Sequence, residues 1–158
     1  MIPCVEASDE HRRPEGLDDT TVVGLGKLTE ALERVERARG HLFEFHQLIG
    51  GADAKLDEVV EKLNRAGHHA LADRIETELI GMNVLQGRWT FQVLEEFDGG
   101  YYAKFRELES TARDELASGR QHIYEAEMKE RRRTPGAPGH EARPSLGPPD
   151  PRLRADPP

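Results

Sequence analysis

Proline placement is the feature that most constrains the fold of this chain. The sequence holds ten prolines, and all of them lie at Pro3, at Pro14 or from Pro135 onward. Residues 15–134 therefore form one long stretch without proline. A helical domain requires such a stretch, because an interior proline costs about 3 kcal/mol in a helix. This distribution predicts an all-α fold between two proline-bearing ends.

The apolar residues inside this stretch repeat with the period of a helix. Over residues 25–49 they alternate in steps of three and four, and two polar residues, Arg39 and His46, occupy positions in the same row. The row predicts a first helix of roughly 30 residues that ends at Gly50-Gly51. Gly67 is expected to end the next helix in a left-handed conformation. Similar rows predict three further helices, one over residues 53–66, one that carries residues 71–82, and a long one that carries residues 105–123 and frays through the arginines at 131–133.

Residues 87–105 admit two structures. The sequence Asp-Gly-Gly at residues 98–100 lies between aromatic-rich runs, which fits a hairpin turn. The apolar residues from 91 to 108 also step by three and four, which fits a helix. We expect the helix, because an isolated two-stranded hairpin is only marginally stable. The paired glycines would then mark a break or a kink.

These lengths predict an antiparallel helical bundle with two long helices and a narrow, coiled-coil-like seam. We expect the bundle at residues 18–133, between a flexible segment, 1–17, and a disordered tail, 134–158. The tail contains eight prolines and no aromatic residue, so it buries too little apolar surface to offset the entropy of ordering. Arg39 and His46 favour a homodimer over a bundle closed within one chain, because polar seam residues often set the oligomeric state.

Charge and composition exclude several classes of protein. The formal charge is -8, and residues 18–130 hold 23 acidic against 14 basic side chains. A nucleic-acid binder needs a basic surface, so we expect none here. The chain has no apolar run of membrane-spanning length and no signal peptide at its start, which predicts no membrane association and a cytoplasmic location. Arginine predominates over lysine, and alanine, glycine and proline are plentiful, which favours a bacterial source with a GC-rich genome.

The aromatic segment is the candidate binding surface. Six of the nine aromatic residues lie between residues 89 and 105, beside charged side chains, and aromatic and arginine side chains dominate binding hot spots. The alternative is that the rings only fill the core at a helix break. Tyr101 and Tyr102 discriminate between these, because two adjacent residues of a helix cannot both face the core. The candidate surface consists of Arg88, Trp89, Glu95, Asp98, Tyr101 and Tyr102.

A metal-binding bundle is the alternative function. His41 with Glu44, and His122 with Glu125, each place an imidazole and a carboxylate one helical turn apart. Di-iron bundles use glutamate and histidine at this spacing. The order here is histidine before glutamate, and such pairs arise by chance where 33% of residues are charged. We therefore predict no metal and no other cofactor.

Catalytic motifs are not evident in the sequence. No Gly-x-Ser-x-Gly is present, and the paired glycines lack the flanking strand and the lysine of a phosphate-binding loop. We expect a binding or oligomerisation module that contacts a protein or a small ligand through its aromatic segment. An enzyme is less favoured, and a metal-binding, di-iron-like bundle remains the alternative.

Overall fold

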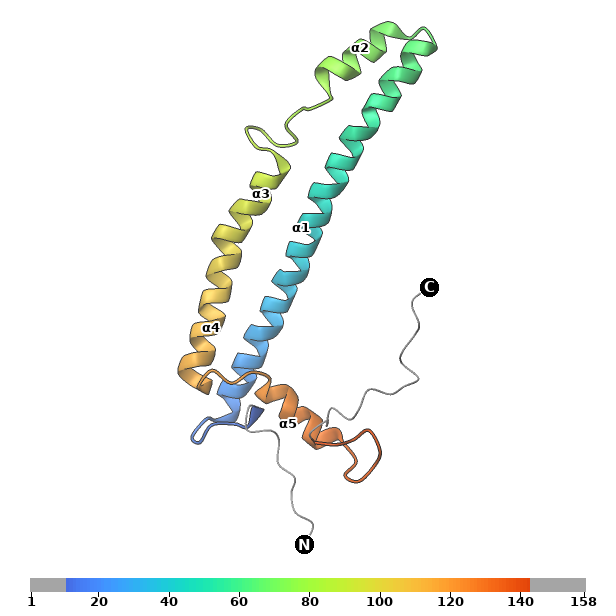
Figure 1. Ribbon diagram of the computed structural model, residues 1–158. Coiled ribbons are helices and arrows are strands. Elements are labelled where there is room, and N and C mark those ends of the chain that lie inside the picture. The colour runs from blue at the N-terminus through green and yellow to red at the C-terminus, as the bar shows by residue number, and fades with distance from the viewer. Residues whose placement is uncertain (1–10, 143–158) are drawn as a thin grey trace. The chain divides into compact units, whose positions relative to one another are not determined.

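The computed structural model describes residues 11–142 and confirms that this part of the chain is all-α, with no strand. A single bridge joins Leu85 and Arg88. Among the described helices none combines the length and the apolarity of a membrane span. The elements in Figure 1 are α1 (Asp19–Arg65), α2 (His69–Glu78), α3 (Thr90–Phe97), the π-helical η2 (Asp98–Tyr102), α4 (Ala103–Ala117) and α5 (Ile123–Arg132).

The chain divides into two compact units. The terminal unit joins Met1–Leu28 to Ser110–Pro158, and the central unit is Thr29–Glu109. Both boundaries fall inside helices, so α1 and α4 each contribute to both units. The flexible segment at residues 1–17 and the disordered tail at 134–158 stay predictions, because residues 1–10 and 143–158 lie outside the described residues.

α1 begins at an aspartate cap. The backbone N–H of Thr21 donates to Oδ1 of Asp18 at 2.9 Å, and the Thr21 hydroxyl donates to Oδ2 at 2.8 Å. An amide of the first turn is thereby satisfied. These bonds to the carboxylate also lower the pKa of Asp18.

The predicted end of the first helix at Gly50-Gly51 is wrong, because α1 continues to Arg65. Half-buried residues recur on α1 in steps of three and four from Leu25 to Leu63, with no change of phase at the glycines. A glycine in a helix costs only about 1 kcal/mol relative to alanine, whereas a break would lose this continuous row. We call the row the seam of α1.

α1 ends at the predicted residue. Gly67 has a φ of 82°, the left-handed conformation that glycine adopts without steric cost. The N–H of His68 donates to the carbonyl of Leu63 at 2.9 Å, and the N–H of Gly67 donates to that of Asn64 at 3.1 Å. These two bonds form a Schellman motif.

The third predicted helix is shorter than expected. α2 ends at Glu78, and Leu71, Leu79 and Met82, which were expected to form a core stripe, are 50%, 48% and 66% exposed. Of this element only Ala72 is buried. The period of a short apolar row does not by itself show which face is covered.

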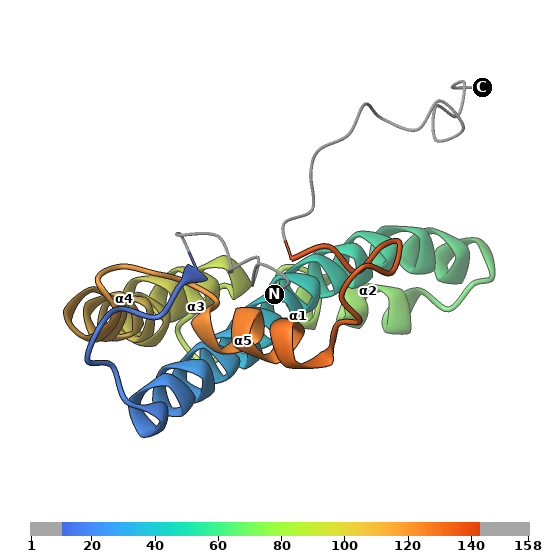
Figure 2. The same ribbon diagram turned by 90° about the horizontal axis from the view of Figure 1, so that it is seen from below.

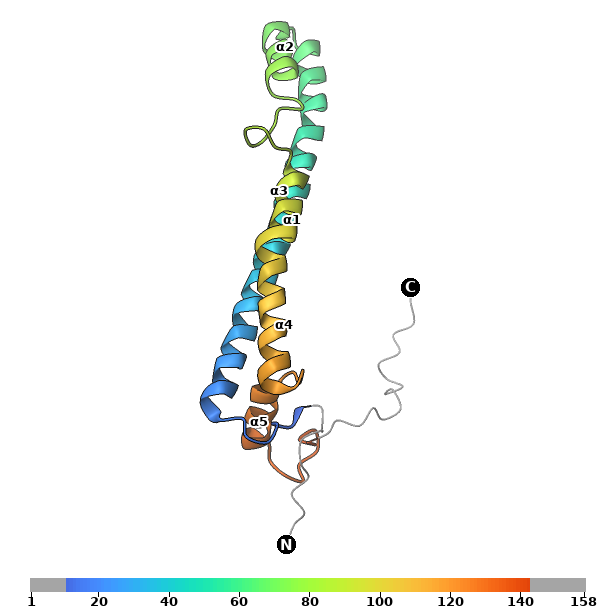
Figure 3. The same ribbon diagram turned by 90° about the vertical axis from the view of Figure 1, so that its left-hand side faces the viewer.

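The returning segment, which we define as α3, η2 and α4, confirms the helical alternative from Thr90 onward, whereas Arg88 pairs with Leu85 in the isolated bridge. α3, η2 and α4 follow one another without interruption and run antiparallel to α1 within the central unit (Figures 1 and 3). The paired glycines form part of the π-helical turn η2 and do not break the helix. A π-helical turn holds one extra residue in a helix that otherwise continues.

The terminal unit has a small core of its own. Val22, Ala117 and Ile123 are buried together, and Figure 2 shows α5 against the first turns of α1. The predicted last helix over residues 105–123 is wrong, because α4 ends at Ala117 and α5 begins at Ile123. Ser118, Gly119 and His122 between them take positive φ values, which no regular right-handed helix accommodates.

Candidate functional site

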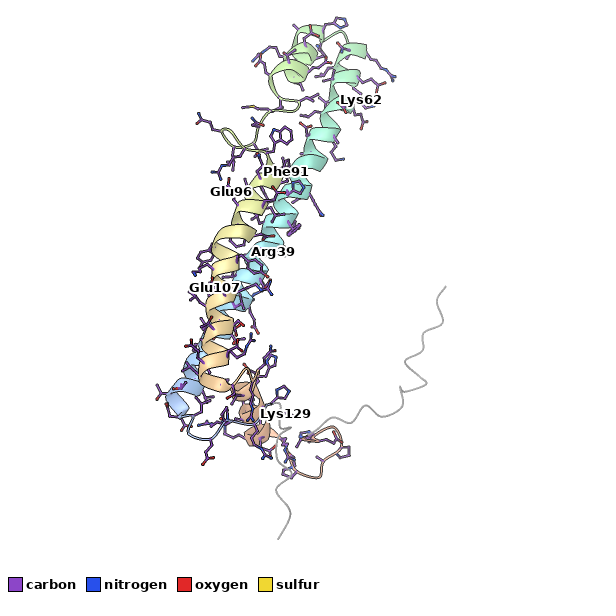
Figure 4. All side chains as sticks on the ribbon, turned by 60° about the vertical axis from the view of Figure 1, so that its left-hand side comes forward. Arg39, Lys62, Phe91, Glu96, Glu107 and Lys129 are labelled. Carbon is purple, nitrogen blue, oxygen red and sulfur yellow. The ribbon has the colours of Figure 1, made fainter. Side chains whose placement is uncertain are left out.

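Three polar residues of α1 form contacts that align this helix with the chain that runs back along it. Arg39, His46 and Asp53 lie seven residues apart in the seam of α1 and so share one heptad position. We call them the polar column. Figure 4 shows Arg39 on α1, with Phe91, Glu96 and Glu107 on the returning segment.

Each member of the polar column has a partner on the returning chain. Nε and Nη2 of Arg39 donate to the two carboxylate oxygens of Asp98 at 2.7 and 2.8 Å. Nδ1 of His46 lies 2.7 Å from the hydroxyl oxygen of Thr90. Oδ1 of Asp53 accepts the backbone N–H of Gly81 at 3.0 Å. Arg39 and His46, predicted as an oligomer seam, thus have partners within one chain, and the homodimer stays a prediction.

Arg39 is also surrounded by aromatic rings. Its guanidinium carbon lies 4.8 Å from the ring centroid of Phe43 and 5.2 Å from that of Tyr102, within the range of cation–π attraction. The hydroxyl of Tyr102 donates to Oε1 of Glu36 at 2.6 Å. The hydrogen bonds from Arg39 hold the pKa of Asp98 below its usual value. The hydrogen bond to Glu36 raises the pKa of Tyr102.

The two adjacent tyrosines point to different environments. Tyr102 is half-buried among these partners, whereas Tyr101 is 60% exposed. The ring of Tyr101 has centroid distances of 5.9 Å to Phe105 in an edge contact and 6.1 Å to Phe97 in a tilted one. Trp89 is likewise 60% exposed and makes an edge contact with Phe91 at 5.4 Å. Two of the six candidate residues are therefore outward-facing aromatics.

The other four candidate residues either hold the central unit together or lie on its surface. Asp98 and Tyr102 belong to the alignment of the central unit. Arg88 is paired with Glu96 on the surface, and Glu95 is exposed. The six residues do not converge on one concave site.

The residues of the metal alternative are surface pairs. Nδ1 of His41 lies 3.5 Å from Glu44, and the two side chains are 81% and 65% exposed. Nδ1 of His122 lies 4.0 Å from Glu125. In the part of the chain that the structure describes, no three histidine, cysteine, aspartate or glutamate side chains gather around a common point. We propose no metal site.

A groove lies where the seam of α1 loses its helical neighbour. Between Glu78 and Thr90 the chain is not helical, and a cavity of about 670 Å³ opens over residues 49–56 of α1. Its apolar lining includes Ile49, Leu56, Leu79, Met82, Val84 and Trp89.

Of the twelve residues that line the groove, only Trp89 was among the predicted site residues, and three of the others have distinct chemistry. Asp53 is the one charged side chain in its lining, Met82 contributes an exposed thioether, and Gly50 leaves a gap in the side-chain surface of α1. A Cβ built on Gly50 meets nothing within 4 Å. Asp53 carried a usable signal, since it follows His46 by seven residues in the seam.

The fold and the exposed surface define an all-α protein whose aromatic side chains are partly left uncovered. Comparison of the chain with protein-family models, with curated proteins and with solved structures finds no match.

Proposed function

We propose that the chain is an interaction module, not an enzyme, and that it pairs with a second copy of itself through one apolar side of the central unit. The observation that carries this proposal is the exposure of Tyr101 and Leu108, which are 60% and 54% exposed on the returning segment.

The central unit covers little of its apolar surface. Within Thr29–Glu109, Ala72 and Leu94 are the only buried apolar residues, and the third buried side chain is Glu109. A pair of helices leaves half of each apolar stripe open unless further helices cover it. Exposed apolar surface of this extent is typical of an interaction site.

The apolar side is built from matching positions on the two antiparallel segments. Tyr101 directly precedes Tyr102, which contacts α1, and Leu108 precedes the buried Glu109. On α1, Phe45 directly precedes His46 of the seam. In an antiparallel pair of right-handed helices, the residues that precede the facing positions lie on the same side of the pair. Phe45, Tyr101 and Leu108 therefore share one side.

This outer face extends along α1. Every seventh residue from Ala31 to Val59 is alanine, valine or phenylalanine, and Leu48 lies beside Phe45 with 65% exposure. A face of 28 residues is about 42 Å long at a rise of 1.5 Å per residue. Two helices with a joint width of about 20 Å lie side by side only over residues 31–46, because the returning segment begins at Thr90, opposite His46. With α1 alone, about 10 Å wide, over the rest, the face offers roughly 650 Å² per copy, within the range of about 600–1,000 Å² per partner of specific interfaces. The outer face consists of Ala31, Ala38, Phe45, Leu48, Ala52, Val59, Tyr101 and Leu108.

A second copy fits this face in shape and chemistry. Two antiparallel helix pairs that cover each other's apolar sides form a four-helix bundle with a closed core. The small side chains at Ala31 and Ala38 permit close approach of a facing helix, while Phe45 and Tyr101 supply contact area with few rotatable bonds.

Sedimentation velocity of the full chain over a range of concentrations tests the proposal. We expect a species of twice 17.8 kDa for the wild type. Tyr101→Glu and Leu108→Glu each place a charge in the apolar contact, so both variants should sediment as monomers. Leu71→Glu is the matched control, because Leu71 is 50% exposed but lies on α2, outside the outer face. A wild type that stays at 17.8 kDa, or an equal effect of all three substitutions, refutes the proposal.

A further inference from the structure

We propose that the groove over residues 49–56 binds a small amine-bearing ligand, with the apolar body of the ligand among the side chains of the lining and its ammonium group on Asp53. The groove shares Ala52 with the outer face, and binding of a ligand in it is tested independently of self-association.

The groove exists because the seam continues where the returning chain does not cover it. Ile49 and Leu56 are seam residues of α1 that would face a helix in a regular pair. The chain opposite them runs as the non-helical connection between Glu78 and Thr90. The apolar seam is thereby turned into a recess that the chain itself leaves unfilled.

The dimensions favour a small ligand over a peptide helix. A volume of about 670 Å³ lies within the range of small-molecule sites. Residues 49–56 span only about 11 Å along the axis at 1.5 Å per residue. A helix that binds in a groove presents anchors over two turns or more and extends beyond them.

The charge of the ligand follows from Asp53. One carboxylate oxygen, Oδ1, accepts the backbone N–H of Gly81 at 3.0 Å. The other oxygen, Oδ2, makes no hydrogen bond or ion pair with the described residues, and Asp53 lies in the wall of the groove. A carboxylate with an open oxygen in an otherwise uncharged apolar wall complements a cation.

Trp89 adds to this preference. Its indole lines the groove and is 60% exposed, so the ring is available to a ligand. An ammonium group near an indole is attracted by the negative face of the ring. Asp53 on α1 and Trp89, directly before α3, therefore both favour a ligand that carries a positive charge.

Gly50 keeps the groove open. It lines the cavity from the interior of a helix, where glycine is unfavourable relative to alanine by roughly 0.5–1 kcal/mol. Apart from the adjacent residues and the backbone of the helix itself, no atom of the chain lies within 4 Å of a Cβ built there, so packing does not require the glycine. A helical glycine facing a cavity permits a ligand to approach the backbone.

The test uses the single tryptophan of the chain, Trp89, as the reporter. Fluorescence of the full-length protein is titrated with three probes that share one apolar body: phenylbutylamine, phenylbutanol and phenylbutyrate. We expect saturable binding of the amine, about tenfold weaker binding of the alcohol, which corresponds to roughly 1.4 kcal/mol, and no measurable binding of the carboxylate.

Three variants locate the site. Gly50→Leu fills the groove and should abolish binding of the amine, whereas Gly51→Leu, the matched control on the neighbouring position outside the lining, should retain it. Asp53→Asn should remove the preference for the amine over the alcohol. Circular dichroism checks that each variant keeps its helix content. The proposal is overturned if the three probes bind equally, if no signal saturates, or if Gly50→Leu binds the amine as the wild type does.

Discussion

Replacing glycine by alanine at four positions of one helical region tests the continuity of α1. Gly50 and Gly51 lie inside the helix, and a Cβ at either position meets nothing within 4 Å. Alanine should therefore increase the free energy of unfolding by about 0.5–1 kcal/mol at each site, because it loses less backbone entropy on folding than glycine. For a chain of 158 residues, each kcal/mol corresponds to a rise in Tm of roughly 2–4 °C.

The same substitution should act differently at two other glycines. At Gly67, with a φ of 82°, alanine should destabilise by about 1–2 kcal/mol, because the left-handed conformation brings its Cβ against the following carbonyl. At Gly26 the new Cβ would lie 3.3 Å from Cβ and Cγ of Tyr124 on α5. This tight contact offsets the gain in helix propensity, so we expect a change close to zero.

Thermal and urea unfolding followed by circular dichroism measure the four variants under one set of conditions. The order of stability should be Gly50→Ala and Gly51→Ala above the wild type, Gly26→Ala near it and Gly67→Ala below it. If alanine at Gly50 and Gly51 lowers stability as it does at Gly67, the helix breaks at the paired glycines and the continuous α1 is wrong.

Three further outcomes follow from the described contacts. Because Arg39 lowers the pKa of Asp98 in the folded protein, this pair stabilises the fold above the unfolded value of 3.8, and the contribution is lost as the pH falls through the folded pKa; Asp98→Asn should flatten the acid limb of stability measured against pH. Tyr102 has a pKa raised above 10.0 by Glu36, so its contribution is present below that value and is lost as the pH rises through the folded pKa; Tyr102→Phe should remove this alkaline loss. Ala117 is fully buried, so Ala117→Leu should overpack the terminal unit and lower the free energy of unfolding by about 1–3 kcal/mol, measured by urea unfolding.

Local backbone structure could be predicted from the sequence where a residue type strongly favours one conformation. Gly67 was predicted as the left-handed end of its helix, and the structure places it there. The helix predicted over residues 88–106 is present from Thr90 onward, and the alternative hairpin had no third strand to pair with. These features depend on the chain within a few residues of each position.

Glycine was a less reliable signal where the seam competed with it. Gly50-Gly51 was interpreted as a stop, although Asp53 and Leu56 continue the seam in the same phase on its far side. Gly119 does lie in a break, and there the heptad row was followed through it in error. Whether a helix continues through glycine depends on the packing of its neighbours, which is a tertiary property.

The groove depends on a property that the sequence of α1 does not contain. Its existence follows from where the opposite chain leaves the helical path, at Glu78, and rejoins it, at Thr90. Trp89 was identified as a candidate from its residue type, but its companion Met82 was expected in a core stripe. The sequence pattern therefore predicted the importance of Trp89 but did not predict the groove that it lines.

The polar column implies that the segment between Arg65 and Thr90, which carries α2, can be replaced without disturbing the rest of the central unit. Arg39 with Asp98 and His46 with Thr90 bind at the base and the middle of the antiparallel pair, below the connection that carries α2. A slip by one heptad, about 10.5 Å, would place Arg39 where His46 now meets Thr90 and leave Asp98 without its cation. These two contacts therefore fix the alignment of α1 with the returning segment without any contribution from α2. A loop of another length, or a different small domain, grafted between Arg65 and Thr90 should leave the remaining pair in register, which makes this protein a scaffold with a replaceable end.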